Sequence, residues 1–389
     1  MLSNRDPIYL DHAATTPVRP EVARVMARCL TDDFGNPSSG HRWGRRARVR
    51  LEDARATVAD ALGAEAATVF FTRGGTESDN LAVLGSVRGA GARVGGTARG
   101  AHVVTSAVEH PAVSAAAAKA VEEGARHTVI GFVEGVFDLD ALRAALEQGA
   151  AVVSCMWVNN ETGLRLPIAR IAAECRRRGA PLHSDAVQAV GKIPLSLAEV
   201  PLDMVTVTGH KIYGPKGTGA LVVRTPELIR PLHFGGGQEG GLRPGTEDVA
   251  GALGLAEAVR LATREEPEES RRLAALRDAV EARLVERIDG VRVNAGGLER
   301  APHILSLAVP RVDLDTLLAA LDADGIAASG GSACASGSLE PSPSLAALYP
   351  GDTTASLRLS FGRLNDESQA DRIVASVADA VTRIRELRG

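Results

Sequence analysis

The chain has 389 residues, of which 45% are hydrophobic and 24% charged, and its formal net charge is −4. These values are ordinary for a soluble globular protein and leave room for about two or three domains' worth of core. The slight negative charge argues against a protein that binds nucleic acid or an anionic membrane surface.

The N-terminal residues carry no apolar signal core, and no segment approaches the roughly 20 apolar residues that cross a bilayer. Four cysteines, at positions 29, 155, 175 and 334, form no C-x-x-C pair, so neither a zinc site nor a disulfide framework is indicated. We therefore expect a cytoplasmic protein without a permanent metal site. One unpaired cysteine in such a protein can still act as a nucleophile.

Between residues 67 and 224, short β-branched segments alternate with helical patterns. Strands are expected at residues 67–72, 102–105, 151–158, 181–184, 203–208 and 219–224, and helices at 76–87, from 111 onward, and at 167–178. The last of these strands should return antiparallel after a glycine-rich turn. Alternation of this kind predicts an α/β domain with a mixed, mostly parallel sheet flanked by helices.

After Thr246 the pattern changes. Residues 247–288 predict a long, charged helix that breaks near Glu265-Glu266-Pro267. It is followed by a strand at 303–309, a helix at 313–323, a strand at 356–361 and a helix at 366–387. This order predicts a smaller α+β domain.

Two of the segments that follow predicted strands contain residues typical of an anion site or of proton transfer. Ligands of open α/β sheets bind beyond the carboxyl ends of the strands. The sequence Arg73-Gly74-Gly75-Thr76 predicts a phosphate cup at a helix N-terminus, with a plain helix cap by Thr76 or Ser78 as the alternative. His110, before Pro111, should face the same crevice, although a capping role is more common for a lone histidine.

Three further segments end in polar side chains. Asn160 offers an amide to a ring substituent or a carboxylate, unless it only shapes a turn. Asp185 ends a buried strand, where an acid requires a partner. Lys211 lies between an apolar strand and a glycine-rich turn, a setting that suits an imine-forming lysine better than a solvated basic turn.

A phosphate cup, a histidine, an asparagine, an aspartate and a lysine are the parts that a pyridoxal 5'-phosphate enzyme requires. In this interpretation the cup holds the phosphate, Asp185 keeps the pyridine nitrogen protonated, and Lys211 carries the aldehyde as an imine. Their occurrence in five successive strand–helix units makes coincidence a poor explanation.

The smaller domain contains two further candidates. Cys334 stands in the small-residue loop Ser329-Gly330-Gly331-Ser332-Ala333-Cys334, where we expect an accessible, reactive thiol rather than a buried one. Arg358 interrupts an apolar strand, which is explained by a clamp on an amino-acid carboxylate or by a structural ion pair.

At this point the chain resembles the cysteine desulfurases of the NifS/IscS class, which are class-V aminotransferase-like, fold-type I pyridoxal phosphate enzymes. The resemblance runs through nearly the whole length, in YLDHAATTP (9–17), FGNPSS (34–39), GTESDN (75–80), EH (109–110), NNE (159–161), DAVQ (185–188), GHK (209–211), RPGT (243–246) and the Cys334 loop. Several of these motifs are specific, and they occur in the family's order.

The resemblance implies a role for each matching residue. Lys211 would bind the cofactor aldehyde, and Cys334 would take the sulfur as a persulfide while alanine is released. The cofactor would be held by Gly75, Thr76, His110, Asn160, Asp185, Gln188, Thr208, His210, Lys211 and, from the other subunit of a homodimer, Thr246. His110 would stack on the ring and transfer protons. The substrate would be bound by Asn36, Asn160 and Arg358.

The resemblance also implies a domain arrangement and partners. The large cofactor-binding domain is expected at 15–262, and a small domain at 1–14 and 263–389, with a mobile cysteine loop at about 327–341. The partners would be L-cysteine and a sulfur-acceptor protein, with no nucleic acid or membrane bound directly. Iron–sulfur assembly, tRNA thiolation, DNA phosphorothioation and thio-cofactor synthesis all stay open as the pathway, as does a transient iron–sulfur cluster at Cys334.

Two alternative functions remain at the level of sequence. A selenocysteine lyase or another fold-type I enzyme such as an aminotransferase would turn over without Cys334. A degenerate scaffold that only docks sulfur acceptors would lack the visible absorption of the cofactor.

Overall fold

The computed structural model describes residues 6–93, 100–330 and 342–388, and Cys334 lies outside these ranges. The chain divides into two compact units, which are described separately. One contains residues 16–157 and 166–265, and is called the large unit here. The other contains residues 1–15, 158–165 and 266–389, and is called the small unit.

The large unit is built on a seven-stranded sheet with the order β2-β10-β9-β8-β7-β3-β4. Its strands are β2 (Val69–Thr72), β3 (His102–Ser106), β4 (Arg126–Ile130), β7 (Val152–Ser154), β8 (Leu182–Asp185), β9 (Met204–Thr208) and β10 (Gly219–Val223), with a separate hairpin of β5 (Phe132–Val133) and β6 (Val136–Phe137). Strand β10 is antiparallel to both its neighbours, and the other pairs are parallel. The predicted mixed, mostly parallel sheet is confirmed, including the antiparallel return.

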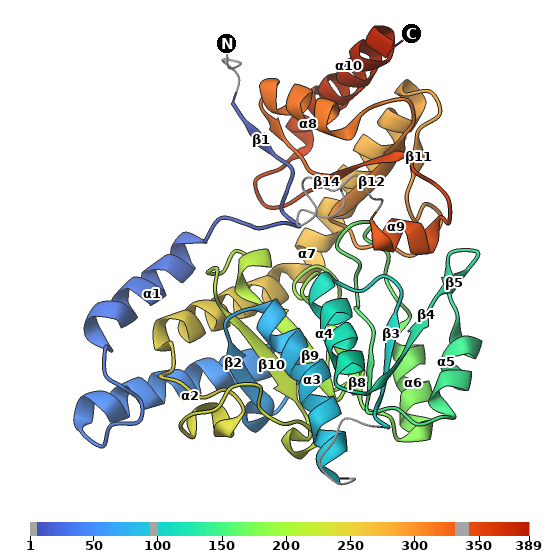
Figure 1. The fold of residues 1–389 in the computed structure, drawn as a ribbon. Helices are drawn as coiled ribbons and strands as arrows, with labels where there is room; N and C mark the ends of the chain where they lie inside the picture. Colours follow the sequence, from blue (N-terminus) through green and yellow to red (C-terminus); the bar gives the residue numbers. More distant parts are fainter. Residues whose placement is uncertain (1–5, 94–99, 331–341, 389) are drawn as a thin grey trace. The chain divides into compact units, whose positions relative to one another are not determined.

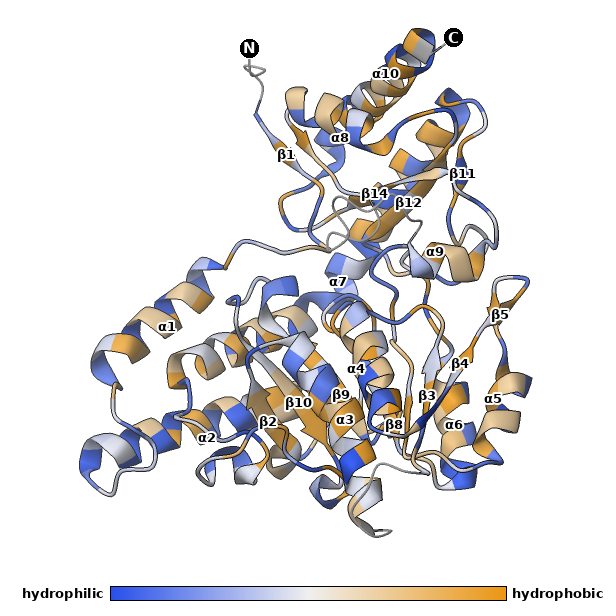
Figure 2. Ribbon diagram, in the orientation of Figure 1, coloured by the Kyte–Doolittle hydropathy of each residue, from blue (hydrophilic) through white to orange (hydrophobic). Residues whose placement is uncertain are grey.

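Helices flank this sheet (Figure 1). They are α1 (Pro20–Asp32), α2 (Arg42–Leu62), α3 (Gly75–Arg93), α4 (Pro111–Glu122), α5 (Leu139–Leu146), α6 (Ile168–Arg178) and the first part of α7 (Val249–Arg287). Strands β2 and β10 are strongly apolar (Figure 2), whereas the central strand β8 carries the polar residues His183, Ser184 and Asp185. A helix around Cys29 was predicted and is present as α1, whereas α2 was not among the predicted elements.

The small unit has its own core. Strands β11 (Arg292–Val293), β12 (Ile304–Val309) and β14 (Ala355–Ser360) form an antiparallel sheet, while β1 (Ile8–Tyr9) pairs in parallel with β13 (Ile326–Ala327). The remaining helices are α8 (Leu314–Ala323), α9 (Pro343–Leu348) and α10 (Ala370–Arg388). Apolar side chains from these elements and the second part of α7 form one buried cluster that includes Leu276, Leu307, Phe361 and Val377.

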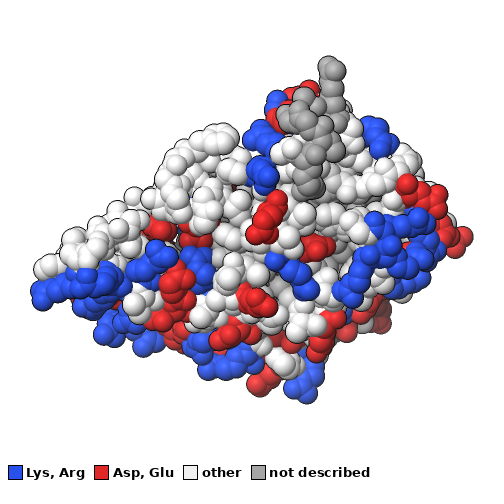
Figure 3. All heavy atoms as spheres, turned by 90° about the horizontal axis from the view of Figure 1, so that it is seen from below, with Lys and Arg blue, Asp and Glu red and all other residues white. Residues whose placement is uncertain are grey.

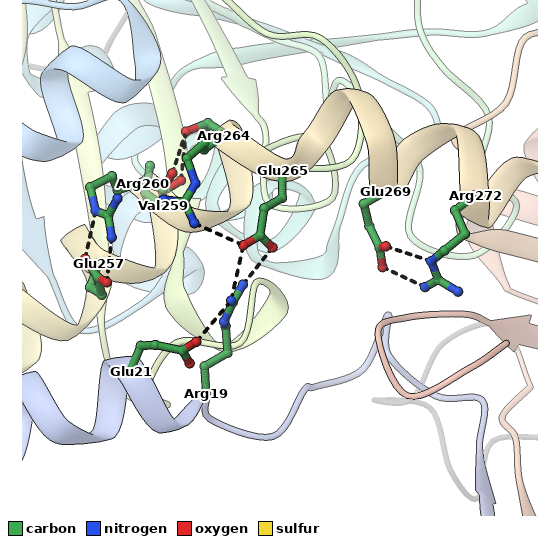
Figure 4. Close-up of polar contacts among 10 residues, drawn as sticks. Arg19, Glu21, Glu257, Val259, Arg260, Arg264, Glu265, Glu269 and Arg272 are labelled. Atoms are coloured by element: carbon green, nitrogen blue, oxygen red, sulfur yellow. Dashed lines mark hydrogen bonds and ion pairs between the residues drawn. The ribbon is translucent and has the colours of Figure 1, made fainter.

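The predicted break near Pro267 is wrong, because α7 runs uninterrupted from Val249 to Arg287. Proline removes one helical hydrogen bond, and polar contacts are present on the turns before and after it. Before Pro267, Arg19 donates to both carboxylate oxygens of Glu265, at 2.8 and 3.2 Å; after it, Glu269 accepts from Arg272 (Figure 4).

Surface charge forms no single-sign field on the face drawn in Figure 3, where basic and acidic side chains are interspersed. Among the described residues, no helix is both long and apolar enough to cross a membrane. The described residues also hold no group of three or more His, Cys, Asp or Glu side chains suited to a metal ion.

Candidate active site

The predicted phosphate cup is a tight turn between β2 and α3. Gly74 has φ +137°, which favours glycine, and a Cβ on Gly75 would lie 3.2 Å from the Val187 side chain. Thr76 is exposed at the first turn of α3, whose N-terminus presents backbone N–H groups and the positive end of the helix dipole. The turn therefore has the backbone geometry and polarity of an anion site.

His110 caps helix α4. Its Nδ1 accepts a hydrogen bond from the Ala112 backbone N–H at 3.1 Å, so the imidazole in this arrangement is neutral with its proton on Nε2. Burial lowers the pKa of His110, the negative charge of Asp185 raises it, and the positive charge of Lys211 lowers it. The fold therefore shows His110 as a helix cap. His110 also interacts electrostatically with Asp185 and Lys211, two other predicted site residues.

Asp185 ends β8 and is 6% exposed. Its Oδ1 accepts from the Val187 backbone N–H at 2.9 Å. Burial raises the pKa of this carboxyl, while His110, the Val187 hydrogen bond and Lys211 lower it. A buried carboxylate of this kind gains stability from a cation placed beside it. Gln188 follows on the next turn and is also buried.

Lys211 closes a short 3₁₀ helix, Gly209–Lys211, that directly follows β9. Only glycine fits at 209, since a Cβ there would lie 2.8 Å from the Thr218 hydroxyl. Tyr213 adopts the left-handed φ of 63° and its N–H donates to the Thr16 hydroxyl at 2.7 Å. The turn that carries Lys211 is therefore fixed on both sides.

Thr208 and His210 flank the same turn. The Thr208 hydroxyl donates to the Thr218 carbonyl at 2.9 Å. Burial, with a further contribution from Lys211 and Lys216, lowers the pKa of His210 to about 4. His210 is therefore neutral near pH 7 and acts there as a hydrogen-bonding group rather than a charge.

A buried polar cluster beneath these residues was missed by sequence reasoning. His183 on β8 lies 2.9 Å from the Ser154 hydroxyl and 3.0 Å from the Thr206 hydroxyl, and its Nε2 is 3.6 Å from Asp79 Oδ1. Burial raises the pKa of Asp79, and Asp185 raises it further. The sequence did contain a signal for this cluster, namely polar residues inside otherwise apolar strands. Buried polar side chains need hydrogen-bond partners, so their presence in a sheet interior indicates a polar cluster.

Glu109 is a second acid, after Asp79, to which the sequence patterns assigned no role. One of its oxygens accepts from the Met156 backbone N–H at 2.8 Å and from the Ser106 hydroxyl. Burial raises the pKa of Glu109 to about 8, against the 4.5 of an ordinary glutamate. The side chain is therefore largely neutral near pH 7, next to His110 in the chain.

Replacing Glu109 by glutamine should remove a pH dependence of stability. The folded protein holds this proton up to about pH 8, whereas the unfolded chain loses it near 4.5, so the stabilising contribution falls as pH rises between these values. Glutamine cannot ionise, so the free energy of unfolding of Glu109→Gln should not fall in this way. Relative to the wild type, it should increase by about 3–5 kcal/mol as the pH rises from roughly 5 to 9. Urea unfolding at a series of pH values measures this gain.

The matched control is Glu122→Gln, which changes an exposed glutamate on α4. Its unfolding curves should follow those of the wild type at every pH. Identical pH slopes for Glu109→Gln and the wild type would show that Glu109 is not a buried neutral acid.

Arg358 lies within the small unit on β14 and is 1% exposed. Its Nη2 donates to Asp11 Oδ1 at 2.9 Å, and its Nη1 donates to the Asn160 carbonyl at 2.8 Å. Arg358 therefore forms the structural ion pair that was the alternative to a carboxylate clamp, with Asp11 as its partner. The structure also brings Arg358 into contact with Asn160, a second predicted substrate-binding residue.

Asn36 and Thr246 are exposed residues of the large unit. Asn36 Oδ1 accepts from the Ser38 backbone N–H at 2.8 Å and so shapes a turn. Thr246 lines an open pocket of about 430 Å³ together with Glu77 and Arg243, which are joined by an ion pair of 2.9 Å. Glu77 also accepts from the Arg73 N–H at 2.7 Å, which ties this pocket to the cup.

The three cysteines within the described ranges are buried and free. Burial raises the pKa of the Cys29, Cys155 and Cys175 thiols, in the case of Cys175 to about 12. None of these three therefore has the exposed, acidic thiol that a nucleophile requires. The fourth, Cys334, and most of its expected loop lie outside the described residues.

Comparison with known proteins gives matches over nearly the whole chain. The family model described as aminotransferase class-V matches residues 8–373. A cysteine desulfurase of Gluconacetobacter diazotrophicus is 42% identical over 98% of this chain and 94% of its own length. A cysteine desulfurase IscS of Cronobacter sakazakii is 42% identical with the same two coverages. The solved structure of a NifS-like protein superposes with a TM-score of 0.88 at 30% identity, covering 97% of this chain and 100% of that one.

Proposed function

The chain belongs to the class-V aminotransferase family and, within it, to the cysteine desulfurases, and we propose that it removes sulfur from L-cysteine to give L-alanine and a persulfide on Cys334. The resemblance seen in the sequence is confirmed by these matches. The observation that carries the proposal is the 42% identity to a cysteine desulfurase over 98% of the chain.

Pyridoxal 5'-phosphate fits the residues that the large unit presents. Asp185 is a buried acid that a protonated pyridine nitrogen would stabilise, and the Gly74–Gly75 turn opens the N-terminus of α3, whose polarity suits a phosphate. When bound, this cofactor supplies an electron sink for the α-carbon of an amino acid. Lys211 would form the bond to the cofactor aldehyde, which is the role that the resemblance to this family implies for it.

The other cofactor contacts follow from the same resemblance. Around the ring and phosphate we assign His110, Asn160, Gln188, Thr208, His210 and, across a homodimer, Thr246, in addition to Gly75 and Thr76. The neutral state of His110, with its proton on Nε2, suits a residue that stacks on a ring and relays protons near pH 7. Thr246 lies on an exposed segment, as a contact with a second subunit requires.

The substrate carboxylate would be bound by Arg358 and Asn160, with Asn36 also lining the substrate site. The Cys334 thiolate would attack the substrate sulfur, so that a new S–S bond forms on Cys334 while the substrate C–S bond breaks. The substrate carbon takes up a proton and leaves as alanine. Activity should therefore rise with pH through the pKa of the Cys334 thiol.

The persulfide sulfur would pass to an acceptor protein in the cytoplasm. The acceptor pathway stays open among iron–sulfur cluster assembly, tRNA thiolation, DNA phosphorothioation and thio-cofactor synthesis. We propose a homodimer with a large domain at 15–262, a small domain at 1–14 and 263–389, and the cysteine loop at about 327–341.

The proposed function is tested with the purified protein loaded with pyridoxal phosphate. With L-cysteine and a thiol reductant it should form alanine and sulfide in equal amounts. With L-alanine and a keto acid it should show no amino-group exchange. Transamination without sulfide release, or a protein with no visible cofactor band, would contradict the proposal. Faster turnover of L-selenocysteine in the absence of Cys334 would identify a lyase instead.

A further inference from the structure

Asp11 is held in place by two β-type contacts of the small unit. Strand β1 ends two residues before it, and the Leu10 N–H donates to the Ala327 carbonyl at 2.8 Å. On the other side the Ser360 N–H donates to the Leu10 carbonyl at 2.7 Å, and Asp11 forms a parallel bridge with Ser360. The backbone of Asp11 therefore lies in a fixed position beside the end of β14.

The Asp11 carboxylate uses one oxygen for two donors. Oδ1 accepts from Arg358 Nη2 at 2.9 Å and from the Ser329 hydroxyl at 3.0 Å. Ser329 is itself fixed to β14, because its backbone exchanges two hydrogen bonds with that of Arg358, at 2.7 and 3.3 Å. The orientation of the carboxylate is thus set by the same strand that carries the arginine.

This arrangement compensates the buried charge of Arg358. The guanidinium is 1% exposed, and a buried cation is costly unless a counter-charge and hydrogen bonds compensate it. The Asp11 carboxylate supplies the counter-charge and the Asn160 carbonyl accepts the second hydrogen bond, at 2.8 Å. The contacts at Nη1 and Nη2 together fix the plane of the guanidinium before any ligand binds. Less side-chain entropy of Arg358 is therefore lost when a ligand carboxylate binds.

We infer that Asp11 is a positioning residue that orients Arg358 and thereby sets the preference of the protein for amines that bear a carboxylate. The inference rests on the proposed function, in which Arg358 binds the substrate carboxylate. Asp11 acts only through Arg358, so its removal should weaken the recognition of the carboxylate and leave the recognition of the amino group unchanged.

The test compares two amines on the protein loaded with pyridoxal phosphate. L-alanine carries a carboxylate and ethylamine is its carboxylate-free counterpart, and binding of each is followed by the visible absorption of the cofactor. Asp11→Asn keeps the shape but removes the charge, and should raise the dissociation constant for L-alanine about tenfold, the value of a charged hydrogen bond. The constant for ethylamine should stay within about twofold.

Two comparisons decide the outcome. Asp6→Asn, an exposed acid of the same N-terminal segment, should bind both amines like the wild type. In the background of Arg358→Ala, the further change Asp11→Asn should have no effect on L-alanine binding, since the residue through which Asp11 acts is gone. Equal weakening of both amines by Asp11→Asn, or no weakening of L-alanine, would overturn the inference.

A second variant serves if Asp11→Asn does not fold. Ser329→Ala removes the other donor to Oδ1 and should weaken L-alanine about threefold, less than Asp11→Asn because the ion pair of Asp11 with Arg358 is kept, without affecting ethylamine. Unchanged L-alanine binding in that variant would contradict the inference. Two results would instead contradict the proposed role of Arg358: no preference for L-alanine over ethylamine in the wild type, or the same preference in Arg358→Ala. The inference about Asp11 would then fail as well.

Discussion

Alanine in place of Cys334 should abolish sulfide release from L-cysteine while the cofactor stays bound. The thiol is the group to which the substrate sulfur is transferred, and no other side chain can replace it as acceptor. Loss of a nucleophile lowers turnover by a factor on the order of 10³ or more. Sulfide detection measures the activity, and mass spectrometry of the protein after L-cysteine treatment detects the added sulfur atom.

The matched control for this experiment is Cys175→Ala. The Cys175 thiol is buried and its pKa is raised to about 12, so it should contribute nothing to sulfur transfer. That variant should release sulfide at the wild-type rate. Undiminished release from Cys334→Ala would remove the persulfide from the mechanism and favour a lyase.

Replacement of Lys211 by alanine should eliminate the imine absorption of the bound cofactor together with the activity. Lys211 is held on the 3₁₀ turn after β9, and its positive charge acts on His110 and Asp185. Its amine is the group that would attach the cofactor aldehyde, and turnover should fall by a factor on the order of 10³. The visible spectrum of the loaded protein reports the loss without reference to turnover.

Lys216→Ala provides the comparison, because Lys216 is an exposed lysine of the same glycine-rich segment. It should keep the imine band and the activity. If Lys211→Ala retained the band of the wild type, another lysine would be the point of attachment.

The strand-end residues of the large unit were predictable from sequence. In a mostly parallel sheet the carboxyl ends of the strands lie at one edge, so residues that follow them in the chain, such as His110, Asp185 and Lys211, come together whatever the loop lengths. The electrostatic interactions that link these three residues in the fold agree with that expectation.

Other features depended on contacts that sequence patterns do not reveal. The pairing of Arg358 with Asp11 joins residues 347 positions apart, and no local pattern predicts it. Glu109 and Asp79 gain their raised pKa values from burial, which follows from packing rather than from neighbours in the chain. Pro267 indicated a helix break, yet α7 continues through it, with the tertiary ion pair of Arg19 and Glu265 on the turn before the proline.

The pairing of β1 with β13 has a consequence for synthesis of the protein on the ribosome. Ile8 pairs with Ile326, so the N-terminal strand must wait for 326 − 8 = 318 further residues before its partner exists. At about 5–20 residues per second this delay is roughly 16–64 s. The large unit can form its sheet within that time, whereas Asp11 reaches Arg358 only after nearly the whole chain has been made. Truncation near the C-terminus should therefore leave the large unit folded and the N-terminal strand open to proteases.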